Sequence, residues 1–315
     1  MSERVAFLGL GIMGSRMAAN VAGAGFDLIV WNRTQSTAER FCETHQAALA
    51  HTPQDAAADA EFVITMVVDG PQVEQVLLGE NGAARAARPG TLFIDCSTIG
   101  PAATHEIADQ LAKRDLALLD APVTGSSPKA QDGTLTIMVG GPEAGFHRAR
   151  PLFDAMGELI VYAGPSGQGQ MVKLLNNAVA ASNASVLAQA LVVGKRAGVD
   201  LDALVSVMGA GAGGSTMLDL KAGPMRTHDY TTLFKDVRSD SGEVTQEIQP
   251  FFKLEHMLKD VRLCLEEGQA LGVPFPAAAL TREILSASTG RGHADHDFSA
   301  MIDVIEAAAD TRLTE

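Results

Sequence analysis

A lysine and two asparagines near the middle of the chain have the types and spacing of an acid–base site. Lys173, Asn176 and Asn177 lie in a proline-free run of helix-forming residues, 168–194. On a helix, offsets of three and four bring both amides to the lysine's side. One cation and two amides beside the glycine-rich segment 164–169 would suit a small oxyanion. The alternative is that Lys173 is a solvated surface lysine.

The N-terminal segment 9–14, GLGIMG, has the GxGxxG spacing of a dinucleotide-binding turn. It follows an apolar run, 4–10, and precedes a predicted helix, 15–24, and a second strand, 26–31. Gly9 would make the turn, Gly11 would admit a pyrophosphate, and Gly14 would let the helix pack on the strand. The helix N-terminus would then face the phosphates with its partial positive charge. The alternative is an ordinary glycine-rich turn.

The end of the second predicted strand bears on the choice of nicotinamide cofactor. NAD-selective units usually carry an acidic residue there, which accepts from the ribose 2′-hydroxyl. Here the strand ends in Asn32, Arg33 and Thr34, and Asp27 lies at its other end. Because Arg33 can engage a 2′-phosphate with charge and a planar donor fork, we expect NADP(H) to be preferred, with NAD(H) also possible. The alternative is a solvated Arg33 and weak selectivity.

Strands and helices alternate through the first half of the chain, which predicts a parallel sheet covered on both faces. Predicted strands are 61–68, 91–96, 116–119, 134–139 and 159–162, and predicted helices are 72–78 and 101–114. In such sheets ligands bind at the carboxyl ends of the strands. Those ends carry Val67 and Val68, Thr98, and the segment 121–126.

After Gly164 the pattern becomes helical, with predicted helices at 168–194, 200–208, 215–221, 252–271, 276–288 and 298–309. Asp200 and Ser215 are candidate N-caps, and the polar segment 227–250 is expected to be a loop. We therefore predict an α/β N-terminal domain with a Rossmann-type doubly wound sheet, 1–163. A long central helix joins it to an all-α C-terminal domain, 164–315.

Composition narrows the class of partner. The chain has 315 residues, 46% of them apolar, and a formal net charge of −14. That charge disfavours binding to nucleic acid or to an anionic membrane. The three cysteines form no spaced framework, and the N-terminus does not resemble a signal peptide, so a cytoplasmic protein is expected. Polar residues interrupt every apolar run long enough to cross a membrane. His293 and His296 lack a third ligand by spacing, so no metal is expected.

Four motifs in order resemble the β-hydroxyacid dehydrogenases. Residues 7–14, FLGLGIMG, look like the cofactor motif of that family, and 120–126, DAPVTGS, look like its substrate motif. Residues 167–169, GQG, with Lys173 and Asn177, look like the catalytic motif. Residues 259–261, KDV, look like a lysine motif at the cofactor and site. The resemblance covers residues 4–309 and implies hydride transfer between nicotinamide and a small carboxylated semialdehyde or hydroxyacid.

The resemblance implies a role for each site residue. Lys173 would be the general acid and base, with its pKa lowered toward neutrality, and Asn177 would hold the reacting oxygen or orient the lysine. The substrate, a small anion, would contact Thr124, Gly125, Ser126 and Asn176. The cofactor would contact Gly9, Leu10, Gly11, Ile12, Met13, Gly14, Asn32, Arg33, Thr34, Val67, Val68, Thr98 and Lys259.

Two departures from the family pattern leave the substrate open. Thr124 replaces the usual serine, and Ser126 replaces the usual second glycine. The residues after Ser126 are more similar to the glyoxylate and succinic semialdehyde reductase branch than to the hydroxyisobutyrate branch. Three alternatives remain: a NAD-dependent 3-hydroxyisobutyrate dehydrogenase, an enzyme of the imine reductase kind, and a non-catalytic dinucleotide-binding protein. The family also implies a homodimer or homotetramer.

Overall fold

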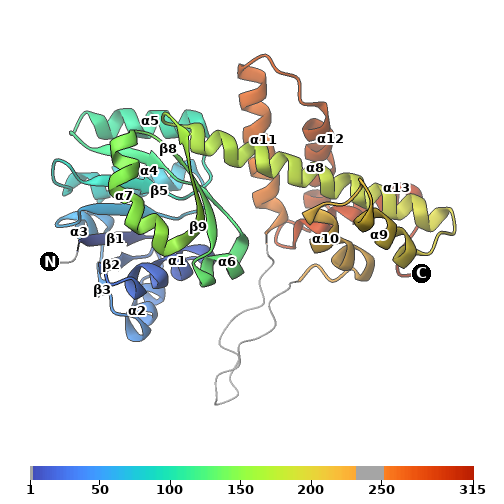
Figure 1. Cartoon of the computed structure of the whole chain (residues 1–315), viewed down its shortest axis with the longest axis horizontal. Coiled ribbons are helices and arrows are strands. Elements are labelled where there is room, and N and C mark those ends of the chain that lie inside the picture. The colour runs from blue at the N-terminus through green and yellow to red at the C-terminus, as the bar shows by residue number, and fades with distance from the viewer. Residues whose placement is uncertain (1–2, 232–251) are drawn as a thin grey trace. The chain divides into compact units, whose positions relative to one another are not determined.

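The computed structural model describes residues 3–231 and 252–315 (Figure 1). The chain forms two compact units, Met1–Leu174 and Leu175–Glu315, and the long helix α8 (Gln168–Arg196) contributes to both. The domain boundary near residue 163 stays a prediction.

The first unit contains a mixed sheet with helices between its strands. Its elements are β1 (Arg4–Leu8), α1 (Ile12–Gly23), β2 (Asp27–Trp31), α2 (Gln35–Thr44), β3 (Ala48–Leu49), α3 (Pro53–Ala57), β4 (Phe62–Thr65), α4 (Gly70–Leu78), η1 (Ala83–Arg85), β5 (Leu92–Asp95), α5 (Pro101–Ala112), β6 (Ala117–Asp120), β7 (Val123–Thr124), α6 (Ser126–Asp132), β8 (Leu135–Gly140), α7 (Glu143–Met156) and β9 (Gly157–Gly164). The strand order is β3-β2-β1-β4-β5-β6-β8-β7, and β9 pairs with β8.

The central strands β1, β4 and β5 are buried on both faces, as a doubly wound sheet requires. Along β1, Val5 and Phe7 join one apolar core, whereas Ala6 and Leu8 join another. The first core takes side chains from α1, α2, α6 and α7. The second takes side chains from α3, α4 and α5. Because β1 pairs with β2 on one side and β4 on the other, the order reverses beside β1, where open α/β sheets bind ligands.

The expectation of an all-parallel sheet is wrong for its last strands. The six strands from β3 to β6 are parallel, but β8 runs antiparallel to β6 and β7. Between β7 and β8 the chain forms only the seven-residue helix α6. That helix is about 10 Å long, shorter than the roughly 20 Å of a six-residue strand. It therefore cannot return the chain to the opposite edge for a parallel strand.

The second unit is helical. After α8 come α9 (Leu201–Ala210), α10 (Thr216–Thr227), α11 (Leu254–Ala270), α12 (Pro276–Gly290), η2 (Phe298–Met301) and α13 (Ile302–Ala309). Both predicted caps form: Asp200 Oδ1 accepts from the Ala203 N–H at 2.8 Å, and Ser215 Oγ accepts from the Leu218 N–H at 3.1 Å. The loop predicted over 227–250 falls largely on residues 232–251, outside the described residues.

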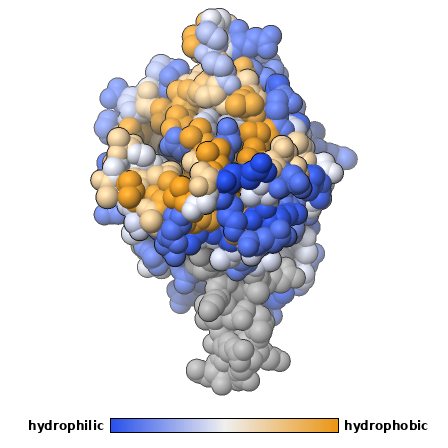
Figure 2. All heavy atoms as spheres, turned by 90° about the vertical axis from the view of Figure 1, so that its right-hand side faces the viewer, coloured by the Kyte–Doolittle hydropathy of each residue, from blue (hydrophilic) through white to orange (hydrophobic). Residues whose placement is uncertain are grey.

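Helix α8 is long and apolar enough to cross a membrane, but 56% of its most apolar window is buried inside the protein. It is therefore a core helix. Part of its surface remains exposed, and large apolar side chains follow it at Val172, Leu175, Val179, Val186 and Val193. Apolar residues also gather on the molecular face drawn in Figure 2.

Candidate active site

The glycine turn after β1 has the backbone that its sequence predicts. Gly9 has φ +105°, and a Cβ there would lie 2.4 Å from the Met66 carbonyl oxygen. A Cβ on Gly14 would lie 2.0 Å from the Gly9 carbonyl oxygen. Both positions therefore require glycine. Gly11 is different, because a Cβ there would meet nothing within 4 Å. It is the N-cap of α1, which begins at Ile12 and continues through Met13, and its open side leaves room for a phosphate against the helix N-terminus.

The side-chain amide of Asn32 connects the loop after β2 to this glycine turn. Asn32 Oδ1 accepts from the Leu10 N–H at 2.9 Å, and Asn32 Nδ2 donates to the Thr34 carbonyl at 3.0 Å. Asn32 thus joins the two loops and directs its side chain to backbone groups. Arg33 is exposed. Asp27 lies at the other end of β2, where its carboxylate is 2.8 Å from Arg4 Nε, so no acidic residue occupies the tip.

A series of hydrogen bonds holds the loops after β4 and β5 in place. Ser97 Oγ accepts from the Val67 N–H at 2.9 Å, and the Ser97 N–H donates to Asp95 Oδ1 at 3.1 Å. Asp95 also accepts from Thr65 Oγ1 at 2.7 Å. Burial raises the pKa of Asp95 to about 6, against the effect of these hydrogen bonds. Val68 is 45% exposed, and Thr98 is partly buried in the same pair of loops.

The predicted substrate segment lies where β7 passes into α6. Thr124, Gly125 and Ser126 are all partly buried. Gly125 has φ +136°, and a Cβ there would lie 2.7 Å from Lys129 Cβ. Ser126 has φ +58°, a left-handed conformation that favours glycine. Ser126, which replaces the family's second glycine, therefore keeps a backbone conformation for which glycine is better suited.

The start of α8 is anchored to the sheet by Asp120, at the carboxyl end of β6. Its two oxygens accept from the N–H groups of Gly167 at 2.8 Å and Gln170 at 2.9 Å. Burial raises the pKa of Asp120, and these backbone donors oppose that effect. A Cβ on Gly169 would lie 2.4 Å from the Met138 carbonyl, so only glycine allows this close approach. Lys173 follows about one turn later and is 6% exposed.

Asn177 lies one turn beyond Lys173 and is 5% exposed. Its Nδ2 donates to Asp260 Oδ2 at 2.7 Å, and Lys259 Nζ lies 2.8 Å from the other oxygen of Asp260. The second unit therefore joins Asn177 to Lys259 through one carboxylate. Asn176 is exposed and donates from Nδ2 to Asn177 Oδ1 at 3.2 Å.

Four side chains in these networks were not among the predicted site residues: Asp95, Asp120, Gln170 and Asp260. Two of them had a signal in the sequence, since Asp120 opens the DAPVTGS motif and Asp260 lies inside KDV. Asp95 lies one residue before the end of a predicted strand, and Gln170 lies within the GQG–lysine motif. Each of the four also has a partner 30 to 83 residues away. Local patterns do not reveal such pairings.

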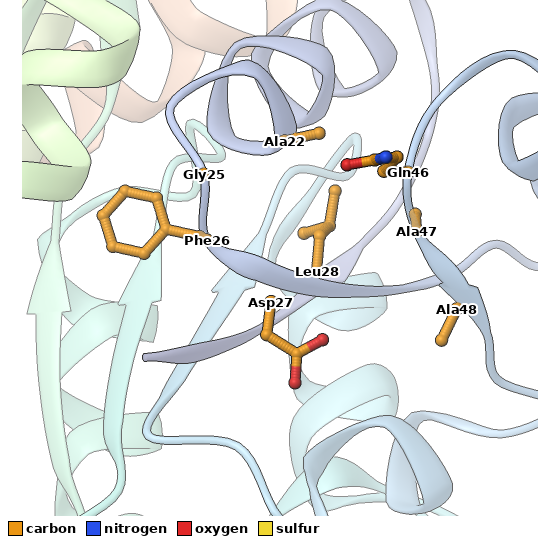
Figure 3. A pocket seen from close by; sticks show the side chains of 8 residues that line it. All are labelled: Ala22, Gly25, Phe26, Asp27, Leu28, Gln46, Ala47 and Ala48. Atoms are coloured by element: carbon orange, nitrogen blue, oxygen red, sulfur yellow. The ribbon is translucent and has the colours of Figure 1, made fainter. Parts of the chain in front are cut away.

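A pocket of about 410 Å³ lies in the first unit away from this chemistry (Figure 3). It is lined by Ala22, Gly25, Phe26, Asp27, Leu28, Gln46, Ala47 and Ala48. Asp27 begins β2 and Ala48 begins β3, and both strands run parallel to β1. The glycine turn follows the other end of β1, so the pocket is at the opposite edge of the sheet.

The second unit contains a cluster with metal-ligand types that the sequence did not predict. Ligand atoms of His228, Asp303 and Glu306 lie within 4.8 Å of one another. Arg312 Nη1 lies 2.8 Å from Asp303 Oδ1 and 2.9 Å from Glu306 Oε2, so a guanidinium already balances both carboxylates. His293 contacts both His296 and Asp303. The two contacts of Arg312 hold the C-terminal residues against α13.

Residues 4–164 match the protein family described as the NAD binding domain of 6-phosphogluconate dehydrogenase. Residues 167–237 and 241–305 match the family described as NAD-binding of NADP-dependent 3-hydroxyisobutyrate dehydrogenase. Together these matches span nearly the whole chain and meet at the start of α8.

Individual relatives agree over the same length. The chain is 32% identical to 2-hydroxy-3-oxopropionate reductase of Escherichia coli, covering 98% of this chain and 99% of that one. It is 33% identical to NAD-dependent L-serine dehydrogenase of Pseudomonas aeruginosa, covering 95% and 96%. The solved Mycobacterium tuberculosis 3-hydroxyisobutyrate dehydrogenase with L-serine has a TM-score of 0.83 and 31% identity, covering 97% and 99%. The chain therefore belongs to the β-hydroxyacid dehydrogenase family of NAD(P)-dependent oxidoreductases.

Proposed function

We propose that the protein is an NADP-preferring reductase of small carboxylated semialdehydes, which also oxidises the corresponding hydroxyacids. The observation that carries this proposal is the pair Lys173 and Asn177, buried one turn apart on α8. A buried lysine beside a hydrogen-bonded amide is suited to move a proton at a reacting oxygen. The glycine turn of the same chain is suited to hold a dinucleotide.

A nicotinamide cofactor, when bound, would supply or accept the hydride. Lys173 Nζ donates a proton to the carbonyl oxygen during reduction and takes it back during oxidation. Asn177 holds that oxygen or orients the lysine, and its donation to Asp260 fixes which way the amide faces. Lys259, paired with Asp260, adds positive charge for the cofactor.

The proposed substrate is a small anion. Thr124 and Ser126 offer hydroxyl groups, and Gly125 a backbone N–H, at a partly buried turn. Exposed Asn176 is a further donor for the substrate. Hydrogen bonds to a charged group are worth about 1.5–3 kcal/mol each, enough to select a carboxylate. The related E. coli enzyme is named for the reduction of 2-hydroxy-3-oxopropionate, a compound of this size and charge.

The proposed cofactor preference rests on the tip of β2. No acidic residue lies there, and Arg33 is exposed beside Thr34. Ile12 and Met13, in the first turn of α1, provide N–H groups for the phosphates. Val67, Val68 and Thr98 are assigned to the nicotinamide side, at the carboxyl ends of β4 and β5.

A screen of purified protein tests the substrate class. NADPH oxidation is followed with glyoxylate, succinic semialdehyde, tartronate semialdehyde, methylmalonate semialdehyde and sulfolactaldehyde. The reverse reaction is followed with 3-hydroxyisobutyrate and L-serine, each with NAD⁺ and NADP⁺. We expect the highest kcat/KM with NADPH and a carboxylated semialdehyde. A preference for L-serine with NAD⁺ would instead favour the second candidate, a NAD-dependent hydroxyacid dehydrogenase, which one relative supports by name.

Replacement of the lysine tests the mechanism. We predict that Lys173→Ala lowers kcat by about 10²–10⁴-fold, the usual cost of losing a general acid. NADPH affinity, measured by fluorescence titration, should change little. Lys195→Ala is the matched control, because Lys195 lies near the other end of the same helix. Turnover above a tenth of the wild-type value in Lys173→Ala would exclude this role.

The assembly and location are part of the proposal. Val172, Leu175, Val179, Val186 and Val193 are spaced by three, four, seven and seven residues along α8. This spacing is typical of a helix seam that packs against another helix, and exposed apolar surface often marks an interface. We propose a cytoplasmic homodimer or homotetramer. Light scattering should give a multiple of 32.9 kDa, and a monomer at micromolar concentration would contradict it.

A further inference from the structure

Gln170 uses both ends of its side-chain amide inside the first unit. It is fully buried. Its Nε2 donates to the Ser97 carbonyl at 2.8 Å, and its Oε1 accepts from the N–H groups of Ile99 at 3.1 Å and Gly100 at 3.3 Å. Because one end must donate while the other accepts, a carboxylate or an apolar side chain of the same length cannot replace the amide.

These three partners form the loop between β5 and α5, which also carries Thr98. The same loop reaches the segment after β4, because Ser97 Oγ accepts from the Val67 N–H at 2.9 Å. Gln170 therefore connects α8 to the two loops assigned to the nicotinamide side of the cofactor. A buried amide with three backbone partners is a firm connection, since leaving any of those groups unpaired is costly.

The connection lies next to the proposed catalytic lysine. Gln170 precedes Lys173 by three residues, so the two side chains are neighbours on α8, and both are buried. The backbone N–H of Gln170 is itself held by Asp120 at 2.9 Å. The first turn of α8 is thus held from the sheet by Asp120 and from the β5–α5 loop by Gln170.

We infer that Gln170 is a positioning residue, which aligns Lys173 with the loop that carries Thr98. This inference rests on the proposed function, in which Lys173 transfers the proton. A reacting group displaced by about 1 Å can lose about 10²-fold in rate. The amide of Gln170 therefore affects turnover more than it affects binding.

A matched pair of substitutions tests this role. Gln170→Met keeps the length of the side chain and removes the amide, whereas Gln110→Met makes the same change at an exposed position of α5. We expect Gln170→Met to lower kcat by about 10–100-fold, while the Kd for NADPH changes by less than about threefold. Gln110→Met should match wild type. A folded Gln170→Met enzyme with wild-type kcat would overturn the inference.

Gln170→Glu gives a pH signature that a merely structural role would not. The ionised glutamate cannot donate to the Ser97 carbonyl, but the protonated form can. The kcat of Gln170→Glu relative to wild type should therefore rise as the pH falls from about 8 to about 6, because burial favours the protonated acid. The same ratio for Gln110→Glu should stay flat. A flat ratio for Gln170→Glu would also overturn the inference, and this variant decides if Gln170→Met does not fold.

Hydrogen exchange separates this inference from the proposed function, because it needs no turnover. The Ile99 and Gly100 amides should exchange faster in Gln170→Met than in wild type or Gln110→Met. If wild type turns over none of the screened compounds, the proposed function fails, yet faster exchange would still support the connection. Unchanged protection at both amides would show that Gln170 does not hold the loop.

Discussion

Arg33 lies at the tip of β2, next to an asparagine that is already committed to the backbone. Asn32 bonds both Leu10 and Thr34, so Arg33 is the side chain of this loop that can meet a 2′-phosphate with positive charge. A guanidinium pairs with a phosphate through two parallel donors. A carboxylate at the same place would repel it.

We predict that Arg33→Ala raises the KM for NADPH at least about tenfold, since a charge-assisted contact is worth about 1.5–3 kcal/mol. The KM for NADH should change little, because NADH has no 2′-phosphate. Arg40→Ala, at an exposed position of α2, is the control for a general loss of positive charge. Initial rates with both cofactors give the comparison. Unchanged selectivity in Arg33→Ala would assign the preference elsewhere.

At the residue scale, the type and spacing of residues predicted where the backbone requires glycine. Gly9 and Gly14 were expected from GxGxxG, and the close contacts of their backbones explain why no larger residue fits. The pairing of Asp120 with α8 could not be expected, because its partners are 47 and 50 residues away. A carboxylate from a neighbouring strand, rather than a local cap, satisfies that helix start.

At the scale of elements, two helix starts were predicted from their caps, since Asp200 and Ser215 cap α9 and α10 as expected. The helices α2, α3, α6 and α7 were not predicted, although α3 has a capping box and α7 extends over 14 residues. Pro151 lies inside α7, and an internal proline usually argues against a helix. Packing on the sheet outweighs that local preference here.

Helices α10 and η2 are joined by a buried ion pair in the second unit. Lys221 Nζ lies 2.8 Å from both oxygens of Asp297, and it lies 4.3 Å from the centroid of the Phe298 ring. Both side chains are almost fully buried. Burial lowers the pKa of Lys221, and Asp297 opposes that effect. Asp297 also caps η2 by accepting from the Ser299 N–H.

We predict that Lys221→Met destabilises the second unit by about 3–5 kcal/mol, because it leaves a buried carboxylate unpaired. The double variant Lys221→Met, Asp297→Asn should recover much of this loss, since asparagine is neutral and still caps η2. Lys253→Met, whose partner Asp295 is 78% exposed, should cost about 0–1 kcal/mol. Urea unfolding followed by circular dichroism measures all three. Equal losses in Lys221→Met and Lys253→Met would contradict this reading of the pair.

At the scale of the whole molecule, strands and helices alternate through the first half of the sequence, and only helices follow. That change of pattern was enough to predict an α/β part followed by an all-α part. The reversal at β8 was not predictable, because it depends on which edge of the sheet the chain reaches after α6. The network from Asp95 through Ser97 to Gln170 likewise depends on four segments meeting at one end of the sheet.

Asp95, at the same end of the sheet, makes the stability of the first unit depend on pH. Asp95 is fully buried, and it lies opposite Asp120 in the β5–β6 register. Among residues 3–231 and 252–315, its Oδ2 has no hydrogen-bond partner. Burial, with a smaller contribution from the charge of Asp120, raises its pKa from 3.8 to about 6 against the hydrogen bonds from Thr65 and Ser97. The folded state therefore binds this proton more tightly than the unfolded state. The contribution of Asp95 to folding is accordingly complete below about pH 3.8, and it is lost as the pH rises through about 6.

For one proton, the interval between these two pKa values corresponds to about 3 kcal/mol. We predict that the free energy of unfolding of Asp95→Asn, compared with wild type at each pH, rises by about that amount from pH 4 to pH 7. Asparagine keeps an acceptor for Thr65 and Ser97 but does not titrate. Trp31 is the only tryptophan of the chain and lies in β2, so its fluorescence during urea unfolding reports on the first unit. Asp109→Asn, at an exposed position of α5, makes the same chemical change outside the core and should give a nearly constant difference. If the two variants had parallel pH profiles, the buried Asp95 carboxyl would not be the group that couples folding to pH.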